Sequence, residues 1–403
     1  MTTFTPQDES GVLETVQWAL GENAPLEVIG RGSKRALGRP VQTGHTLELS
    51  HLSGVTLYEP EELVLSAKAG TPVADIEKLL ASKGQALQFD PMDYGPLLGQ
   101  DAAQGSIGGA LATNLSGSRR LKSGAARDHI LGVRVVSGRG ELFKSGGRVV
   151  KNVTGYDLSK GMAGSWGTLG VATEVTFKVL PAPETETTLA VRGLTEEEAS
   201  RAMAVAMGSS EEVASAAHLP ETVTGKVLGG VLSGEASTLL RLEGFASSVA
   251  SRVERLKTVL KSTGTIDELG VDQSRPLWRE IRDCLPFADG SQKAIWRVSM
   301  TPTEAHKMVM SMRMGTGVDA FYDWQGGLVW LRMEADPEAE ALRLLIKKFG
   351  GGHATLVRAP VAVRAALDVF EPQATPLAAL SKRLKDQFDP KGILNPGRMV
   401  SGL

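Results

Sequence analysis

Cysteine is nearly absent from this chain, since Cys284 is the only one among 403 residues. One thiol allows no internal disulfide, no cysteine-based zinc site and no iron–sulfur cluster held by this chain alone. A charge excess is absent as well, because 44 basic residues face 46 acidic ones and leave a net charge of −2. The chain therefore lacks the general field that attracts nucleic acid or anionic lipid. We expect a reducing compartment and no nucleic-acid partner.

Long apolar runs are also missing. No stretch approaches the ~18 consecutive apolar residues of a membrane span, and the polar start of the chain has no signal-peptide pattern. We expect a cytoplasmic protein without a membrane span, and peripheral attachment to the inner membrane through partners is the alternative. The histidines are scattered at His45, His51, His129, His218, His306 and His353. None of them lie three or four residues apart, so no metal site is predicted.

The length exceeds the roughly 250–300 residues that one hydrophobic core serves, so we expect more than one domain. In residues 1–183, strands alternate with helices. Thr71 and Pro72 predict the N-cap and the first position of a helix. Apolar and polar residues alternate over 171–179, which predicts a strand that Pro181 ends. Further elements expected here are a helix ending at Gly21 and strands near 26–29, 47–49 and 63–65.

Residues 184–370 repeat one order of elements twice. Helices are predicted over 195–208, 246–261, 302–314 and 337–348. Strands are predicted near 187–192, 213–218, 238–243, 294–299, 318–323, 328–333 and 353–357. Two β-α-β-β-α-β units make an antiparallel sheet with helices on one face, which we interpret as a cap domain. In 371–403 a helix with Leu377, Leu380 and Leu384 precedes a tail that should pack back on another domain, and Lys385 is expected on a solvated face.

A glycine-rich basic turn, Gly30-Arg31-Gly32-Ser33-Lys34-Arg35, follows the strand at 26–29. Glycine allows close backbone approach, successive N–H groups can form an anion-binding nest, and the basic side chains add positive charge. The turn would suit a pyrophosphate, and a surface turn with solvated charges is the alternative. It is neither a Rossmann fingerprint nor a Walker loop, because Arg35 stands in place of the third glycine.

Two later segments are crowded with small residues. In 104–114 consecutive glycines let the main chain approach a flat ligand, with polar groups from Ser106, Thr113 and Asn114. A small-residue helix contact is the alternative here. In 164–171 glycine recurs at every third position, which favours a loop that offers its backbone to a ligand over a plain turn.

Six motifs in order resemble those of the vanillyl-alcohol-oxidase-type FAD enzymes, which carry a PCMH-type FAD-binding domain. They are the basic turn, 105–109 with Asn114, 128–132, 151–158, 167–171 and 389–397. The resemblance covers nearly the whole chain. Its short cap and the segment 350–360 look most like the E-subunit branch of bacterial glycolate oxidases within that family.

The resemblance implies an α+β fold with three parts: an FAD-binding domain of two α+β subdomains over 1–183, an antiparallel-sheet cap over 184–370, and a segment over 371–403 that returns to the FAD domain. It implies that the pyrophosphate is held by Arg31, Gly32, Ser33, Lys34 and Arg35. The residues implied to line the flavin are Gly105, Ser106, Ile107, Gly108, Gly109, Thr113 and Asn114. Those implied to border the adenine end are Ile130, Gly167, Thr168, Gly170 and Val171.

Two departures from the family bear on chemistry. Members with covalent flavin carry a histidine in the first turn, whereas this turn has none, so the FAD should be dissociable. Single-chain relatives that oxidise 2-hydroxy acids assemble a metal from a histidine-rich cap motif that this chain lacks. The catalytic residues stay unknown. Weak candidates are His353, with a structural histidine as the alternative, and Arg358 as a clamp for a substrate carboxylate, with a surface or inter-domain ion pair as the alternative.

We therefore expect the FAD-binding subunit of a glycolate-type 2-hydroxy-acid dehydrogenase. Hydride would pass from substrate to flavin N5, and electrons would continue to an iron–sulfur partner. The alternative is a non-catalytic subunit that carries FAD as an electron relay or for assembly, beside a homologous flavoprotein subunit that oxidises the substrate. A nucleotide-binding scaffold without FAD is a third hypothesis.

Overall fold

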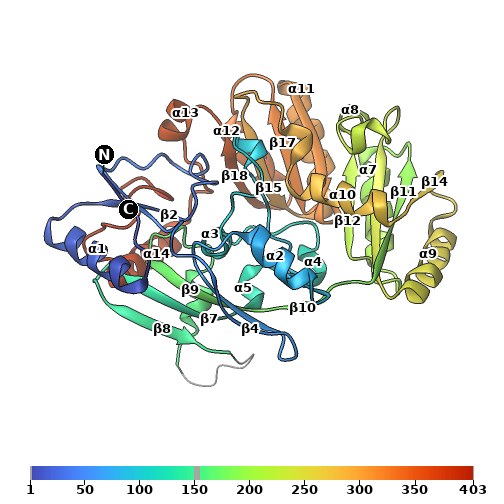
Figure 1. Ribbon diagram of the computed structural model, residues 1–403. Helices are drawn as coiled ribbons and strands as arrows, with labels where there is room; N and C mark the ends of the chain where they lie inside the picture. The colour runs from blue at the N-terminus through green and yellow to red at the C-terminus, as the bar shows by residue number, and fades with distance from the viewer. Residues whose placement is uncertain (1, 149–154, 403) are drawn as a thin grey trace. The chain divides into compact units, whose positions relative to one another are not determined.

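The computed structural model describes residues 2–148 and 155–402, so Lys151–Thr154 of one motif lie outside the described residues. The chain divides into two compact units, each formed by discontinuous segments (Figure 1). Unit 1 comprises Met1–Ser116, Gly124–Pro181 and Pro372–Leu403, and unit 2 comprises Gly117–Ser123 and Ala182–Glu371. Helices and largely antiparallel sheets occur in both units, which confirms the predicted α+β class.

Unit 1 is built on a five-stranded antiparallel sheet. Its strand order is β4 (Val55–Glu59), β5 (Val64–Lys68), β9 (Gly170–Lys178), β7 (Ile130–Ser137), β8 (Leu142–Gly146). The alternation that predicted a strand over 171–179 is thus confirmed by the central strand β9. Helices α2 (Val73–Ala81) and α3 (Ile107–Thr113) share a buried core with this sheet, including Leu65, Leu111 and Phe177.

A second, parallel sheet in unit 1 has the order β1 (Thr2–Phe4), β3 (His45–Glu48), β2 (Leu26–Ile29). Helix α1 (Glu9–Gly21) ends at the predicted glycine and shares a core with this sheet. That core also contains Leu394, which pairs with Leu26 and brings the tail of the chain into unit 1. The remaining short elements are β6 (Gln85–Ala86), β10 (Leu180–Pro181), η1 (Pro96–Leu98), α5 (Ala126–His129) and α6 (Leu158–Met162).

The start of α2 differs by one residue from the prediction. Pro72 is the N-cap residue, and the helix begins at Val73. The Thr71 hydroxyl donates to the Lys68 carbonyl at 2.6 Å and accepts from the Gly54 N–H at 2.9 Å. The prediction was wrong because the Thr71 hydroxyl forms its hydrogen bonds within the turn that precedes the helix and does not cap the helix N–H groups.

Unit 2 contains one eight-stranded antiparallel sheet. Its order is β14 (Ile266–Leu269), β11 (Thr185–Arg192), β13 (Ser237–Gly244), β12 (Ser215–Leu219), β16 (Val318–Asp323), β17 (Leu328–Met333), β15 (Ile295–Met300), β18 (Gly352–Arg358). The two halves meet where His218 pairs with Tyr322. The helices of the two repeats are α7 (Glu196–Met207), α9 (Ala246–Leu260), α11 (Ala305–Gly315) and α12 (Ala339–Lys348). Each pair shares an apolar core with its half of the sheet, so the predicted double repeat is confirmed.

Helix α10 (Val271–Arg282) and strand β14 were not predicted. The alternate residues of β11 lie in the core with α7 and α9, so Glu186 and Thr188 lie on the other face of the strand. There α10 binds them: the Ser274 hydroxyl donates to Glu186, and the Trp278 indole donates to the Thr188 hydroxyl. Pro276 inside the helix and its many charged residues hid the helical pattern. The short elements of unit 2 are α4 (Arg120–Ser123), α8 (Glu221–Thr224), η2 (Leu228–Gly230), η3 (Leu285–Phe287), η4 (Pro302–Glu304), η5 (Trp324–Gly326) and α13 (Val361–Ala366).

Residues Gly117–Ser123 leave unit 1 in mid-sequence and are held by unit 2. The Ser118 hydroxyl donates to Asp323 at 2.6 Å, and the Trp324 indole donates to the Gly117 carbonyl at 2.9 Å. Arg119 forms an ion pair with Glu243 at 2.9 Å. These contacts place the segment within unit 2, although the residues before and after it in the sequence belong to unit 1.

The C-terminal segment begins with α14 (Thr375–Phe388) and continues as the tail. Contrary to expectation, Lys385 is buried, and its ammonium contacts Asp389 at 2.5 Å and the carbonyls of Thr168 and Leu394 at 2.8 and 2.9 Å. Asp389 in turn accepts from the N–H of Leu394 at 2.8 Å. Leu377, Leu380 and Leu384 are about half exposed instead. The buried charged pair, together with the core residue Leu394, holds this segment in unit 1, and the leucine stripe does not.

Replacing Lys385 by methionine is expected to lower the free energy of unfolding by about 3–5 kcal/mol, because it leaves the Asp389 carboxylate buried without its cation. Urea unfolding of the two proteins measures this. Lys382→Met is the matched control, since Lys382 pairs with Asp386 on the exposed side of the same helix and should change stability by about 0.5 kcal/mol or less. Equal losses in both variants would contradict a role for the buried pair.

Candidate functional site

Unit 1 contains an open pocket with about 890 Å³ of empty space, including the solvent at its mouth, and its walls come from distant parts of the sequence. Its wall segments include the end of β2 with the basic turn, the helix α3, and the loop that leads into β9. Asn395 and Arg398 of the tail also line it. The three glycine-rich segments singled out in the sequence therefore meet around one cavity.

The basic turn presents its backbone donors. Among the described residues, the N–H groups of Gly30, Arg31, Gly32 and Ser33 donate to no backbone or side-chain acceptor. Gly32 has a left-handed backbone at φ 77°, and a Cβ on Gly30 would lie 2.1 Å from the Ser106 hydroxyl of the neighbouring wall. Such a run of available amide donors is an anion-binding nest.

The charges of this turn have different surroundings. Arg35 is bound by buried Glu27, with Nε 3.0 Å from the carboxylate, so much of its charge is compensated. Arg31 lines the pocket, and its only hydrogen bond within the described chain is a long one of 3.4 Å to Gln104. Its buried Nε has no partner there. Arg31 is therefore better placed than Arg35 to bind an anionic ligand.

Helix α3 forms the second wall, and its two adjacent glycines have different roles. A Cβ on Gly108 would lie 2.7 Å from the Ala69 side chain, so that glycine lets the helix approach the end of β5. This matches the alternative of a small-residue helix contact. Gly109 faces the pocket, where a Cβ would meet only the Ser106 hydroxyl within 4 Å, at 3.2 Å. Gly109 therefore leaves space for a ligand.

The loop before β9 forms the third wall with left-handed backbone at Gly164, Trp166 and Gly167. A Cβ on Gly167 would lie 2.8 Å from the Asn395 amide nitrogen, and one on Gly170 would lie 2.5 Å from Val135. These glycines allow close packing of the loop against its own unit. Because they have no side chains, the loop can lie close to the rest of unit 1, and this close packing fixes the position of the pocket wall.

The pocket brings together most of the residues predicted to contact the cofactor. Those that line it are Arg31, Gly32, Ser33, Lys34, Arg35, Ser106, Gly108, Gly109, Thr113, Gly167, Gly170 and Val171. Those outside its lining are Gly105, Ile107, Asn114, Ile130 and Thr168. Ile107 of α3 and Ile130 of β7 are buried in the apolar core that the helix and the sheet share. Asn114 ends α3 with a left-handed backbone and accepts from the Arg127 N–H at 3.0 Å.

The lining residues that were not among the predicted cofactor contacts include Trp166, Asn395 and Arg398. The tail was recognised only as a motif that packs on another domain. Asn395 lies in that motif, and Arg398 follows it directly. No local pattern indicates that a residue near position 398 lies beside one near position 34.

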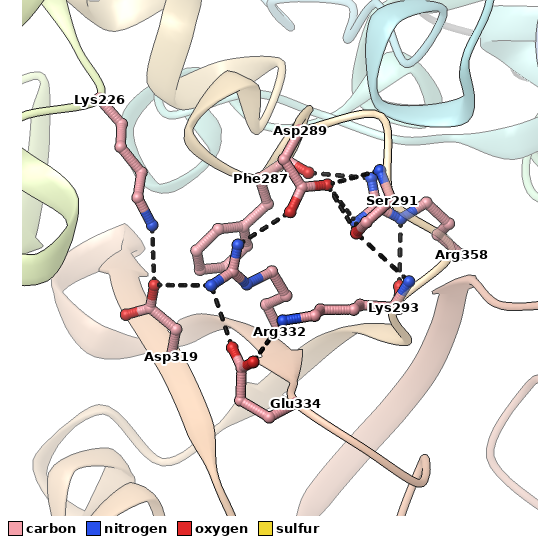
Figure 2. A network of polar contacts seen from close by, with 9 residues as sticks. All are labelled: Lys226, Phe287, Asp289, Ser291, Lys293, Asp319, Arg332, Glu334 and Arg358. Atoms are coloured by element: carbon pink, nitrogen blue, oxygen red, sulfur yellow. Dashed lines mark hydrogen bonds and ion pairs between the residues drawn. The ribbon is translucent and has the colours of Figure 1, made fainter.

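The two weak catalytic candidates both lie in unit 2. Arg358 is buried and bound to Asp289 at 2.9 Å and to the carbonyls of Phe287 and Lys293 at 2.9 and 3.1 Å (Figure 2). Desolvation raises the pKa of Asp289, but hydrogen bonds from Ser291 and the charge of Arg358 hold it well below its usual range. Arg358 thus forms an ion pair, but a buried one within unit 2, not the surface or inter-domain pair of the alternative.

His353 lies on β18, paired with Ser299 of β15. Desolvation and the charge of Arg297 lower the pKa of its imidazole. Within residues 2–148 and 155–402, no group of three or more His, Cys, Asp or Glu side chains could hold a metal ion. No helix in this described part is long and apolar enough to cross a membrane.

Comparison with known proteins adds sequence relatives. A family model described as an FAD binding domain matches residues 2–146. The chain is 35% identical to glycolate oxidase subunit GlcE of Escherichia coli (strain K12), over 97% of each chain. It is 33% identical to glycolate oxidase subunit GlcD of Bacillus subtilis (strain 168), over 41% of this chain and 34% of that relative.

Solved structures share the fold at low identity. Substrate-bound p-cresol methylhydroxylase gives a TM-score of 0.73 at 16% identity, over 98% of this chain and 88% of that one. A 4-ethylphenol oxidase from Gulosibacter chungangensis gives 0.72 at 15% identity, over 99% and 88%. These likenesses establish the architecture that the motifs predicted.

Proposed function

Because this chain belongs to the family of FAD-binding glycolate oxidase subunits, we propose that the pocket of unit 1 is its FAD site and that the protein works within a 2-hydroxy-acid dehydrogenase complex. The observation that carries this proposal is the run of four available N–H groups from Gly30 to Ser33 at one wall of a pocket with glycine in its other walls. A pyrophosphate needs the first feature, and a flat ring needs the second.

The chain's own residues would bind and orient the cofactor. The turn of residues 30–35 would hold the pyrophosphate through its amides, with Arg31 adding charge-assisted bonds. Gly109 would leave room for the body of the cofactor beside α3. Apolar lining residues such as Leu49, Leu111 and Met162 would exclude water from it. When bound, FAD supplies the redox chemistry, accepting hydride from the substrate carbon at flavin N5.

Electrons cannot leave the flavin through an iron–sulfur cluster held by this chain alone, because one cysteine cannot hold such a cluster. We propose an iron–sulfur subunit as the electron-accepting partner and a homologous FAD-binding subunit beside it, since the chain resembles both GlcE and GlcD. Attachment to a membrane, if the complex has it, would then be peripheral and made by partners.

A second candidate function is an FAD carrier without its own substrate chemistry. Two observations favour it: Arg358 is fully engaged in its ion pair, and the described residues contain no metal-ligand group. In this version the homologous subunit oxidises the 2-hydroxy acid, and the present chain relays electrons or supports assembly.

The purified protein is expected to carry FAD that trichloroacetic acid or heat releases completely. No histidine lies in the basic turn, and Cys284 is buried in unit 2 with its thiol pKa raised by burial, so neither usual attachment is available. Absorption of the supernatant and in-gel fluorescence of the denatured chain measure the two fractions. Flavin that stays with the denatured polypeptide would refute the dissociable cofactor, and a protein that binds no added FAD would refute the proposed function itself.

A further inference from the structure

Two residues of the tail complete the pocket from outside the stretch that the FAD family model matches. That model covers residues 2–146, whereas Asn395 and Arg398 are among the lining residues. Both side chains are at least nine-tenths buried. Their contacts connect the two walls that are farthest apart in the sequence, the basic turn and the loop before β9.

Asn395 bridges these two walls by hydrogen bonds. Its side-chain oxygen accepts from the Val28 N–H at 2.7 Å, two residues before the basic turn. Its amide nitrogen donates to the Trp166 carbonyl at 2.8 Å, inside the loop before β9. Asn395 has a left-handed backbone at φ 46°, a conformation that asparagine tolerates better than most residues. The spacing between the two walls is therefore set by one amide group.

Arg398 binds the end of the basic turn through backbone carbonyls. The guanidinium donates to the carbonyls of Lys34 and Arg35 at 2.9 and 3.2 Å, which fixes the last peptide planes of the turn. It also lies 5.9 Å from the centre of the Trp166 ring, so it contacts the opposite wall as well. A Cβ on Gly38 would lie 2.9 Å from Arg398 Nε, and the glycine there leaves space for this approach.

We propose that Asn395 and Arg398 are positioning residues of the cofactor site. Arg398 acts on the pyrophosphate through the turn that it holds, and Asn395 sets the width of the pocket. This inference rests on the proposed function, because it concerns the same pocket. It adds that cofactor affinity depends on the tail as well as on the matched N-terminal segment.

Arg398→Gln tests the inference in the full chain after removal of bound flavin. Dissociation constants are measured for FAD, for ADP, which carries the adenosine and the pyrophosphate without the flavin, and for riboflavin, which lacks phosphate and adenosine. We expect FAD and ADP to bind at least about tenfold more weakly, because a charge-assisted hold on the turn is lost, while riboflavin affinity changes less than about twofold. A loss confined to phosphate-bearing ligands is a result that general loosening of the unit would not give.

Lys391→Gln is the matched control. Lys391 is a cation of the same tail that also donates to a backbone carbonyl, that of Leu20 at 2.8 Å, away from the pocket. We expect it to leave all three affinities unchanged. An equal loss in both variants, or an equal loss for riboflavin in Arg398→Gln, would overturn the inference in favour of simple tail packing.

Arg398→Lys covers the case in which the glutamine variant does not fold. Lysine keeps the charge but can donate to the two carbonyls less well. If both variants fold, the ADP affinity of the lysine variant should lie between those of the wild type and of the glutamine variant. If only the lysine variant folds, its ADP affinity should be about threefold weaker than that of the wild type. Wild-type ADP affinity in Arg398→Lys and in any folded Arg398→Gln protein would refute the role of Arg398. Failure of the wild-type chain to bind FAD would instead refute the proposed function.

Discussion

Gly109→Val is expected to empty the proposed FAD site while unit 1 stays folded. The added side chain would project into the pocket, since only the Ser106 hydroxyl lies within 4 Å of a Cβ at this position. Valine is no poorer a helix former than glycine, so α3 should persist. A branched side chain in a tight binding site costs several kcal/mol, and we expect the dissociation constant of FAD to rise at least about a hundredfold, or about 2.8 kcal/mol.

Flavin content at purification and titration of the apoprotein with FAD measure this effect, and thermal unfolding of the apoprotein tests the fold. Gly161→Val is the matched control, because Gly161 also lies in a short helix of unit 1 and has open space around its Cβ position. It should keep wild-type affinity. Full flavin occupancy in Gly109→Val would place the site elsewhere.

The neighbouring glycines give a less direct test. A Cβ on Gly108 or Gly170 would collide with protein atoms at 2.7 or 2.5 Å, and Gly167 has a positive φ. Valine at any of these positions should destabilise unit 1 itself. Loss of flavin there would report misfolding as much as a blocked site, so Gly109 is the position that separates the two.

The isolated chain, even when loaded with FAD, is expected to be reduced by glycolate or lactate at least about a hundredfold more slowly than the complete complex. The described residues contain no metal-ligand group that would acidify the substrate hydroxyl and hold its carboxylate. Arg358 is already bound to Asp289 and to two carbonyls. A lone general base such as His353 typically contributes about 10²–10⁴ and would not replace both missing functions.

Stopped-flow bleaching of the flavin by a panel of 2-hydroxy acids measures the rate with and without partner subunits. Slow bleaching in the isolated chain that partners accelerate would support the carrier version. Rapid bleaching of the isolated chain by any member of the panel would eliminate that version and make this subunit the site of substrate oxidation. His353→Gln would then test whether the imidazole is the base.

Helices, strands and glycine-rich segments could be predicted where their structure depends on residues close by in the sequence. Strand β9 follows from strict alternation, and α7 follows from the helical periodicity over 195–208. The structure adds a capping box at its start, where the Thr195 and Glu198 side chains are each bonded to the backbone N–H of the other residue. The glycine segments could be recognised because close backbone approach excludes larger residues. Each of these features depends on neighbours within a few positions.

Long-range contacts could not be predicted in the same way. Lys385 looked like part of a solvated face, and its burial depends on the Thr168 carbonyl, more than 200 residues away. The i,i+4 spacing to Asp389 was the one available hint of a pair. Arg398 gave no hint, because its acceptors are carbonyls of the basic turn at the other end of the chain.

The position of Asn395 and Arg398 in the sequence has a consequence for how the protein is made. A ribosome synthesises the chain from its N-terminus, and domains generally fold as units when their residues become available. All of unit 2, up to Glu371, is translated before these two residues are. The basic turn, which forms the first wall of the pocket, is complete once residue 35 has been translated. The middle of the chain can therefore fold during translation. The pocket of unit 1, in contrast, stays incomplete until the tail has been translated. We expect full cofactor affinity only at that late step of biogenesis.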